Sequence, residues 1–271
     1  MAPRSSWLHR DTTVAETLER RAARAALLAE GSTSAVVLQF AAGLYRVQAE
    51  VATALARGGA ALTGSLEQDL DAFRGPLDAI VRYAGASGPP GLRTDVDAYR
   101  AEGTDRLLAW WRGPRAGRTD YLARAILRPY AETLAATGVS PEPAKSPASP
   151  ASACARCGGP AWIGWRRSGS GDEAAQRFVG CAICGSERLL GRIACAACGE
   201  GAPDKLAVFQ TERHPAVRIE ACDACQRYIK SIDLTVDGRA IPEVDDLCSL
   251  SMDLWASEQG YERLEPSLAG V

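Results

Sequence analysis

Eight of the nine cysteines of this chain fall in four Cys-x-x-Cys pairs, and all of them lie after residue 153. Two residues between paired cysteines allow a tight turn to aim both sulfur atoms at one ion. Four thiolates crowded together repel one another unless a cation lies between them, so these residues predict tetrahedral metal sites with four cysteine ligands. The predicted ligands are Cys154, Cys157, Cys181, Cys184, Cys195, Cys198, Cys222 and Cys225.

The pairs also repeat along the chain. Cys154 precedes Cys195 by 41 residues, and Cys181 precedes Cys222 by the same 41 residues. A duplicated metal-binding hairpin explains this spacing. We therefore predict that the first two pairs hold one ion and the last two pairs hold another, each in a module like a zinc ribbon or a rubredoxin. In the alternative, the central four cysteines share one ion and the outer four share another, which would break the repeat.

Glycine follows the second cysteine in three of the four pairs, at Gly158, Gly185 and Gly199, and Gln226 takes this place in the fourth. Glycine permits a left-handed backbone there, which lets amide N–H groups point back at the sulfur atoms. Ligand spacing does not choose between iron and zinc, so we expect two metal ions, Fe or Zn, each in a tetrahedral four-cysteine site.

Other roles for these side chains are less consistent with the pattern. A thioredoxin-like dithiol sits at the start of a helix, whereas these pairs are flanked by predicted strands, and four pairs exceed what one dithiol needs. Cys248 stands alone beside leucines and is expected to be a small buried side chain. His214 precedes a proline in a predicted turn and is expected to be solvated, and His9 has no partner pattern.

No signature of a catalytic site accompanies the cysteines. The chain has two histidines and lacks the glycine-rich phosphate loops and the Gly-x-Ser-x-Gly nucleophile elbow. A metal ion with four cysteine ligands has no open coordination position for a substrate. We therefore predict that the protein is not an enzyme.

Charge bears on nucleic-acid binding, because some zinc ribbons bind nucleic acids. The net charge is −2, and acidic residues outnumber basic ones in the cysteine-containing part. A phosphate-binding surface should be basic, so we predict no nucleic-acid partner and keep a zinc-ribbon nucleic-acid-binding protein as an alternative. The one local basic cluster more commonly marks a solvated surface than a phosphate-binding site. This cluster comprises Arg166, Arg167, Arg177, Arg188 and Arg192.

Helical patterns occupy the first half of the chain, and strand patterns occupy most of the second half. The predicted helices cover 12–30, 32–58, 65–87 with a kink at Pro76, 93–113 and 119–138. The predicted strands cover 160–167, 175–180, 188–194, 205–213, 216–221 and 228–234, and a last helix covers 244–261. We expect the strand at 188–194 to join the two metal modules rigidly.

The predicted fold class is α+β: an N-terminal all-α helical bundle, then two tandem rubredoxin or zinc-ribbon-like modules with four cysteines each, and a C-terminal helix. The predicted divisions are a helical domain (1–140), a Pro/Ala-rich linker (141–153), a first four-cysteine metal module (154–194), a second four-cysteine metal module (195–240) and a C-terminal helix with its tail (241–271). The start of the chain has no signal-peptide pattern, and the most apolar stretch is too short to span a bilayer. We therefore expect a cytoplasmic protein without membrane insertion.

The last part of the chain resembles the FdhE family of formate dehydrogenase accessory proteins. The resemblance rests on the four cysteine pairs, on "RIEACDACQRYIKSIDL" after residue 217, and on "VDDLCSLSMDLWASEQGY" from residue 244. A weaker resemblance extends to "RRAARAALLAEG", "VQAE" and "ARAILRPYAETLA" in the helical half.

This resemblance implies a cytoplasmic accessory protein with rubredoxin-like cysteine modules, associated with iron and needed for the maturation of active formate dehydrogenase. The implied partner is the catalytic, molybdenum-containing subunit of formate dehydrogenase. The implied metal ligands are the eight paired cysteines named above. A rubredoxin-like redox protein is a further alternative for the function.

Overall fold

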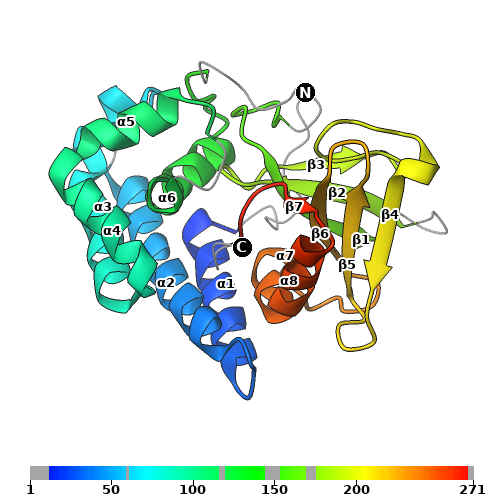
Figure 1. Cartoon of the computed structure of the whole chain (residues 1–271). Helices are drawn as coiled ribbons and strands as arrows, with labels where there is room; N and C mark the ends of the chain where they lie inside the picture. The colour runs from blue at the N-terminus through cyan, green and yellow to red at the C-terminus, as the bar shows by residue number, and fades with distance from the viewer. Residues whose placement is uncertain (1–11, 59–60, 116–119, 144–152, 169–174, 268–271) are drawn as a thin grey trace.

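The structure is a computed structural model, and it describes residues 12–58, 61–115, 120–143, 153–168 and 175–267. Helices from the first half of the chain form one side of the molecule, and a twisted sheet forms the other side (Figure 1). Two short helices near the C-terminus lie between them. The predicted fold class is confirmed, with helices first, strands around two cysteine clusters next and helical segments near the end.

The helical part begins with a hydrogen-bonded cap. The side chain of Thr13 accepts from the Glu16 N–H, and the Glu16 carboxylate accepts from the Thr13 N–H, which satisfies two otherwise free donors. The helices are α1 (Val14–Ala29), α2 (Ala35–Arg57), α3 (Leu66–Ser87), α4 (Pro90–Glu102), α5 (Thr104–Arg112) and α6 (Tyr121–Thr137). Every helix in the described ranges is too short or too polar to cross a bilayer.

The structure divides one predicted helix and shows where another is kinked. The predicted helix at 93–113 is wrong as a single element, because Gly103 has a φ of 63° and separates α4 from α5. The predicted kink in α3 is present, and its non-helical residue is Phe73, three residues before Pro76. This position follows from the proline ring, which crowds the preceding turn of a helix and removes one of its hydrogen bonds.

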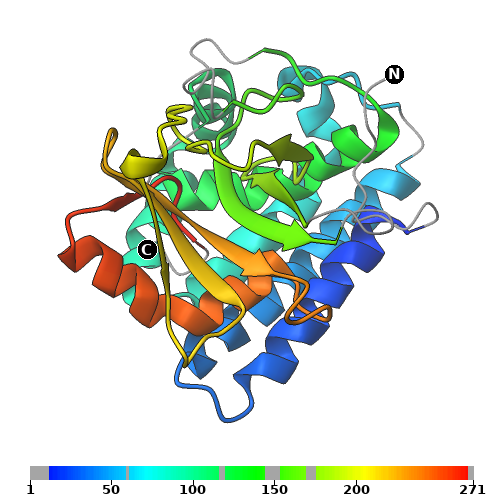
Figure 2. The same cartoon turned by 90° about the vertical axis from the view of Figure 1, so that its right-hand side faces the viewer.

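The strands form one sheet with the order β3-β2-β1-β6-β5-β4, and β7 adds to β6 on a separate branch. They are β1 (Ala161–Arg167), β2 (Gln176–Cys181), β3 (Glu187–Leu190), β4 (Leu206–Gln210), β5 (Val217–Cys222), β6 (Arg227–Asp233) and β7 (Glu262–Arg263). Each half of the sheet is an antiparallel meander of three strands, as a duplicated unit requires. Figure 2 shows the strands from the sheet side of the molecule.

The two meanders are joined side by side by β1 and β6, which run parallel, with Ile163 opposite Lys230 and Arg166 opposite Asp233. The expectation that a strand over 188–194 joins the modules is wrong. Strand β3 ends at Leu190 and forms one edge of the sheet. The rigid connection therefore comes from backbone hydrogen bonds between strands that are far apart in the sequence.

The C-terminal segment is helical, but it is not the single helix predicted over 244–261. It consists of α7 (Pro242–Asp245), the 3-10 helix η3 (Asp246–Ser249) and α8 (Leu250–Glu258). Lys230 of β6 contacts the chain where the helix is interrupted. The carbonyl oxygens of Asp246 and Ser249 both accept from its ammonium, at 2.9 and 3.3 Å. A continuous α-helix would direct the Asp246 carbonyl along its own axis.

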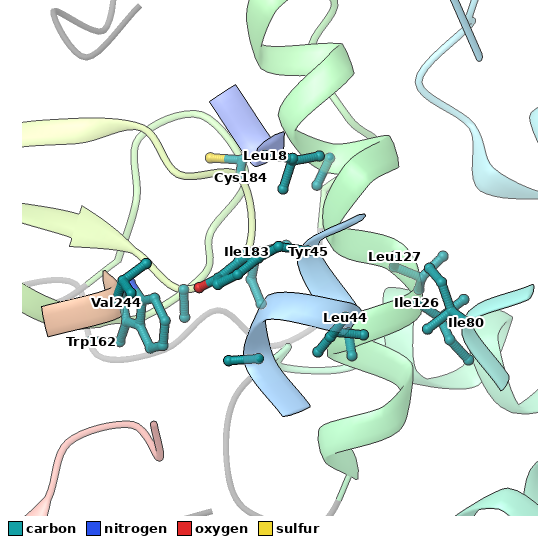
Figure 3. Packing of buried hydrophobic residues seen from close by; sticks show 14 of the residues in the cluster. Leu18, Leu44, Tyr45, Ile80, Ile126, Leu127, Trp162, Ile183, Cys184 and Val244 are labelled. Atoms are coloured by element: carbon teal, nitrogen blue, oxygen red, sulfur yellow. The ribbon is translucent and has the colours of Figure 1, made fainter. Parts of the chain in front are cut away.

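One hydrophobic core runs from the helices into the sheet. Figure 3 shows Leu18 and Tyr45 of the helical part beside Ile183 of the second cysteine turn, with Trp162 of β1 and Val244 of α7 next to them. All five side chains are buried. Helices and sheet are therefore packed on the same core. Residues 144–152 of the predicted linker lie outside the described residues, and the predicted domain boundaries stay a prediction.

A fully buried ion cluster fixes the C-terminal segment to the sheet. Lys230 contacts carboxylate oxygens of Asp246 and Asp253, and Arg263 of β7 donates to the same two carboxylates at 2.9 and 2.8 Å. The Tyr228 hydroxyl donates to Asp253 at 2.8 Å. Two cations and two anions balance, which is the condition under which charges are tolerated in a protein interior.

Replacing Lys230 by methionine should destabilise the protein strongly, because Asp246 and Asp253 would share a buried site with only one cation. We expect a loss of about 3–5 kcal/mol in the free energy of unfolding. Urea unfolding of the metal-loaded protein, followed by circular dichroism, measures it. The exposed Lys205→Met change is the matched control and should stay within about 0.5 kcal/mol. Equal stability of the two variants would contradict the neutral-cluster interpretation.

Candidate metal centres

The eight paired cysteines come together in two separate groups of four. Within each group all four sulfur atoms lie within 4.8 Å of one another. The first group, which we call the first cage, contains Cys154, Cys157, Cys181 and Cys184. The second cage contains Cys195, Cys198, Cys222 and Cys225. This is the grouping that the 41-residue repeat predicts, and the alternative with a shared central group is wrong.

Each cage is built from two cysteine turns with the same backbone. In the first turn of the first cage, the N–H of Gly158 donates to the Cys154 carbonyl at 2.8 Å. The residue after the second cysteine has a positive φ in all four turns, from 55° at Gln226 to 83° at Gly199. Glutamine at this position therefore adopts the left-handed conformation that glycine adopts elsewhere, at some cost in strain. The departure of the fourth turn is one of residue type and not of shape.

Backbone amides also point at the sulfur atoms, as predicted. The Gly159 N–H donates to the Cys157 sulfur at 3.4 Å, and the Ile183 N–H donates to the Cys181 sulfur at the same distance. In the second cage the Ala197 N–H donates to the Cys195 sulfur at 3.3 Å. Such donors stabilise negative charge on a thiolate and orient it toward a metal ion.

The sulfur–sulfur distances fit a tetrahedral ion. Metal–sulfur bonds of about 2.3 Å place the corners of a tetrahedron about 3.8 Å apart. The Cys154–Cys184, Cys195–Cys225 and Cys198–Cys222 distances are all 3.8 Å, and Cys157–Cys181 is 3.4 Å. Without an ion, burial raises the pKa of the Cys181 and Cys222 thiols, so binding of a cation would release their protons.

The first cage is embedded in the protein and contacts the helical part directly. Arg115, which follows α5 and stacks on Trp111 at 4.0 Å, donates to the Cys157 carbonyl at 2.8 Å. Burial lowers the pKa of Arg115, and the nearby cysteines oppose this effect. A side chain at Gly185 would meet the Glu132 carboxylate of α6 at 3.3 Å. The first cage is thus held by contacts from two helices or their ends.

Glu132 belongs to a second buried ion cluster, which sequence reasoning missed. Arg21 of α1 donates to both Glu132 oxygens at 2.9 and 2.8 Å, and Arg128 donates to the same carboxylate at 2.7 Å. Both arginines also pair with Glu243 of α7. The sequence does mark these residues, because Arg21, Arg128 and Glu132 lie inside the helical segments that carry the weaker FdhE resemblance. Amphipathic helices normally expose such charges, so the pattern alone did not predict burial.

The second cage lies at the surface. Cys198 is exposed and Cys225 is half-buried, whereas three of the four cysteines of the first cage are buried. Its supports come from the residues after α8: the Tyr261 hydroxyl donates to Asp223 at 2.5 Å, and the Glu262 N–H donates to the Gln226 carbonyl at 2.8 Å. Both contacts fix the fourth cysteine turn.

The remaining candidate residues lie outside the cages. Cys248 of η3 is half-buried, and burial raises its pKa to about 11, so the thiol is protonated at neutral pH and is a poor metal ligand. His214 lies in the turn between β4 and β5, away from both cages, and burial lowers its pKa. His9 lies outside the described residues.

Comparison with known proteins supports the resemblance found in the sequence. Residues 193–269 match the family model described as FdhE, C-terminal domain. The chain is 28% identical to the Protein FdhE homolog of Pseudomonas putida, in an alignment that covers 94% of this chain and 87% of that protein. It is 38% identical to the Protein FdhE homolog of Aquifex aeolicus over 99 residues, which is 36% of this chain and 35% of the length of that protein.

The fold is also that of a solved FdhE protein. The crystal structure of the FdhE protein from Pseudomonas aeruginosa superposes with a TM-score of 0.69 and covers 98% of both chains at 24% sequence identity. The C-terminal part of this chain, residues 193–269, therefore resembles the FdhE C-terminal domain, and the chain as a whole resembles FdhE proteins, as its sequence predicts.

Proposed function

We propose that this protein is an accessory protein for the maturation of formate dehydrogenase. It binds the catalytic, molybdenum-containing subunit and carries two four-cysteine metal sites that hold iron or zinc. The observation that carries the proposal is the pair of four-sulfur cages in a chain that resembles FdhE proteins along its length. The cages provide a rigid frame, and the helical half packed on it provides further surface for the client protein.

A non-catalytic role agrees with the chemistry of the cages. The ligands of the first ion are Cys154, Cys157, Cys181 and Cys184, and those of the second are Cys195, Cys198, Cys222 and Cys225. Four thiolates complete a tetrahedral ion and leave no position for a substrate. Iron in such a site accepts and donates one electron, which zinc does not do. We infer a reducing compartment such as the cytoplasm, because eight thiolates must stay unoxidised to hold the two ions.

In this proposal the first cage has a structural duty. Arg115 and Glu132 connect it to the helical half, so a bound ion would stabilise the boundary between helices and sheet. The second cage has no helix from the first half of the chain among the contacts described above, and it faces solvent. We therefore assign client contact to the side of the molecule that carries the second cage.

Metal analysis tests the ligand assignment. We expect two ions per chain after anaerobic purification, and one ion per chain in Cys184→Ser and in Cys222→Ser, because each substitution opens one cage. Cys248→Ser is the matched control and should keep both ions. Inductively coupled plasma mass spectrometry gives the count and identifies iron or zinc. Retention of two ions by either cage variant would contradict the assignment, and zinc alone would exclude the electron-transfer version.

The two ions should leave at different rates when a chelator is added. The exposed second cage should lose its ion at least about tenfold faster, because outer contacts such as that of Arg115 protect the first cage. Absorbance of a chromogenic chelator follows the release. The fast phase should be missing in Cys222→Ser, which has no intact second cage. A single phase in the unsubstituted protein would show that burial does not distinguish the cages.

Affinity capture tests the client. The tagged protein, purified from its native cells without oxygen, should retain the formate dehydrogenase catalytic subunit, identified by mass spectrometry. A nucleic-acid-binding ribbon should instead show salt-sensitive retention on DNA. Capture should weaken in a Cys222→Ser variant, whose second cage is opened, and should persist in Cys248→Ser. If the unsubstituted protein retains no formate dehydrogenase subunit, the proposed function is wrong.

A further inference from the structure

The arginine cluster noted in the sequence is divided by the strands into two faces. Side chains alternate along a strand, so Arg166 and Arg177, which are opposite each other in β1 and β2, share one face. Arg167 points to the other face, where it stacks on Phe178 at 3.9 Å and pairs with Glu187. Phe209 of β4 contacts Trp255 of α8, so α8 covers the face of the sheet to which Phe209 points. Val208, the neighbour of Phe209 in β4, points to the opposite face, which also carries Arg166.

A hollow of about 230 Å³ lies on this uncovered face, beside the second cage. Its floor is apolar and includes Leu206, Ile229 and Leu264, and two cysteines of the second cage, Cys195 and Cys222, line one end. Five arginines and one glutamate contribute charge to its lining. These residues are Arg166, Arg177, Arg192, Arg218, Arg227 and Glu220.

Three of these arginines have no acidic partner in the described part of the chain. Arg177 pairs with Glu220, and Arg218 pairs with Asp233 at 2.9 Å. No ion pair or side-chain hydrogen bond joins Arg166, Arg192 or Arg227 to another described residue. The hollow therefore carries an excess of positive charge in a protein whose net charge is −2.

These three arginines are spread along the hollow. Arg227 begins β6 beside the second cage, and Arg166 lies opposite Asp233 at the other end of the same strand. At about 3.3 Å per residue, roughly 20 Å of β6 separates these two positions. A small anion cannot reach both. An extended peptide segment of about six residues would span them.

The surroundings favour a protein segment over a nucleic acid. Ile193 and Val208 border the hollow with 54% and 58% of their surfaces exposed, and they offer apolar contacts. Among the described residues of the lining, Tyr228 is the one aromatic residue, and its side chain is buried, so these residues offer no platform for stacking bases. A peptide that places carboxylates against the arginines and an apolar side chain on the floor would match both the charge and the apolar surface of the hollow.

We propose that this hollow binds an extended acidic segment of the client polypeptide, with carboxylates on Arg166, Arg192 and Arg227 and an apolar side chain between them. The inference rests on the proposed function, because it identifies where and by what chemistry the client is bound. It places the client against the second cage and away from the first.

Charge reversal tests the contact. A variant with Arg166→Glu, Arg192→Glu and Arg227→Glu should retain at least about tenfold less formate dehydrogenase subunit in anaerobic capture, because three attractive contacts become repulsive. The matched control reverses three exposed arginines of the helices, with Arg20→Glu, Arg82→Glu and Arg93→Glu, and should capture as much as the unsubstituted protein. Both variants must keep two metal ions and their melting temperature.

A photo-crosslinker at Val208 gives an independent readout that does not depend on charge reversal. Benzoylphenylalanine at this position should crosslink to a segment rich in Asp and Glu, read by mass spectrometry. A crosslink to a neutral or basic segment or to nucleic acid, or no crosslink, would overturn the inference.

The capture experiment separates the two proposals. Equal capture by the arginine variant and its control would overturn the inference and leave the proposed function standing. Absence of the client from the unsubstituted protein would overturn both.

Discussion

Neutralisation of buried charge is the constraint on which the rest of this structure depends. Arg21, Arg128, Glu132 and Glu243 connect α1, α6 and α7 in the interior, and they tolerate burial only as a balanced set. Arg128 also lies over the ring of Trp162 at 4.9 Å, which brings β1 to the same cluster. Because Glu132 also packs against the cysteine turn at Gly185, the charge cluster, the hydrophobic core and the first cage form one continuous structure.

The two cages therefore have unequal surroundings although their sulfur geometry is alike. The first is enclosed by parts of the chain that are distant in sequence, and the Cys157 carbonyl is bound by a buried arginine. The second belongs to a small separate group of buried residues and is supported mainly by the segment after α8. A duplicated unit has thus kept its local metal-binding geometry, while the two copies occupy different positions in the molecule. This difference gives the second copy the solvent-facing role.

The metal cages could be predicted from sequence because their determinants are local. Two residues between cysteines, a left-handed residue after them and a 41-residue repeat define each turn and its partner. The parallel pairing of β1 with β6 could not be predicted, since no local pattern identifies a neighbour more than 60 residues away. The same holds for Lys230: a lysine in a strand normally lies at the surface, and only its distant partners Asp246 and Asp253 make its burial possible.

The FdhE-like motif near the C-terminus now has a physical meaning. Its Tyr-Ile-Lys strand and its Asp-Leu-x-Ser-Leu-x-x-Asp helix supply the buried cluster around Lys230, and none of these residues is a metal ligand. The arginines on the opposite face of the sheet differ from this cluster, because their charge is not balanced within a buried set. A cage of four thiolates and one divalent ion carries negative charge, and Arg227, opposite the ligand Cys222, offsets only part of it and keeps its place among the three arginines offered to a client. Arg166 of β1 lies opposite Asp233, roughly 20 Å along β6 from Arg227, beyond the ~8 Å over which salt leaves charges coupled, so its full charge is available to a bound partner.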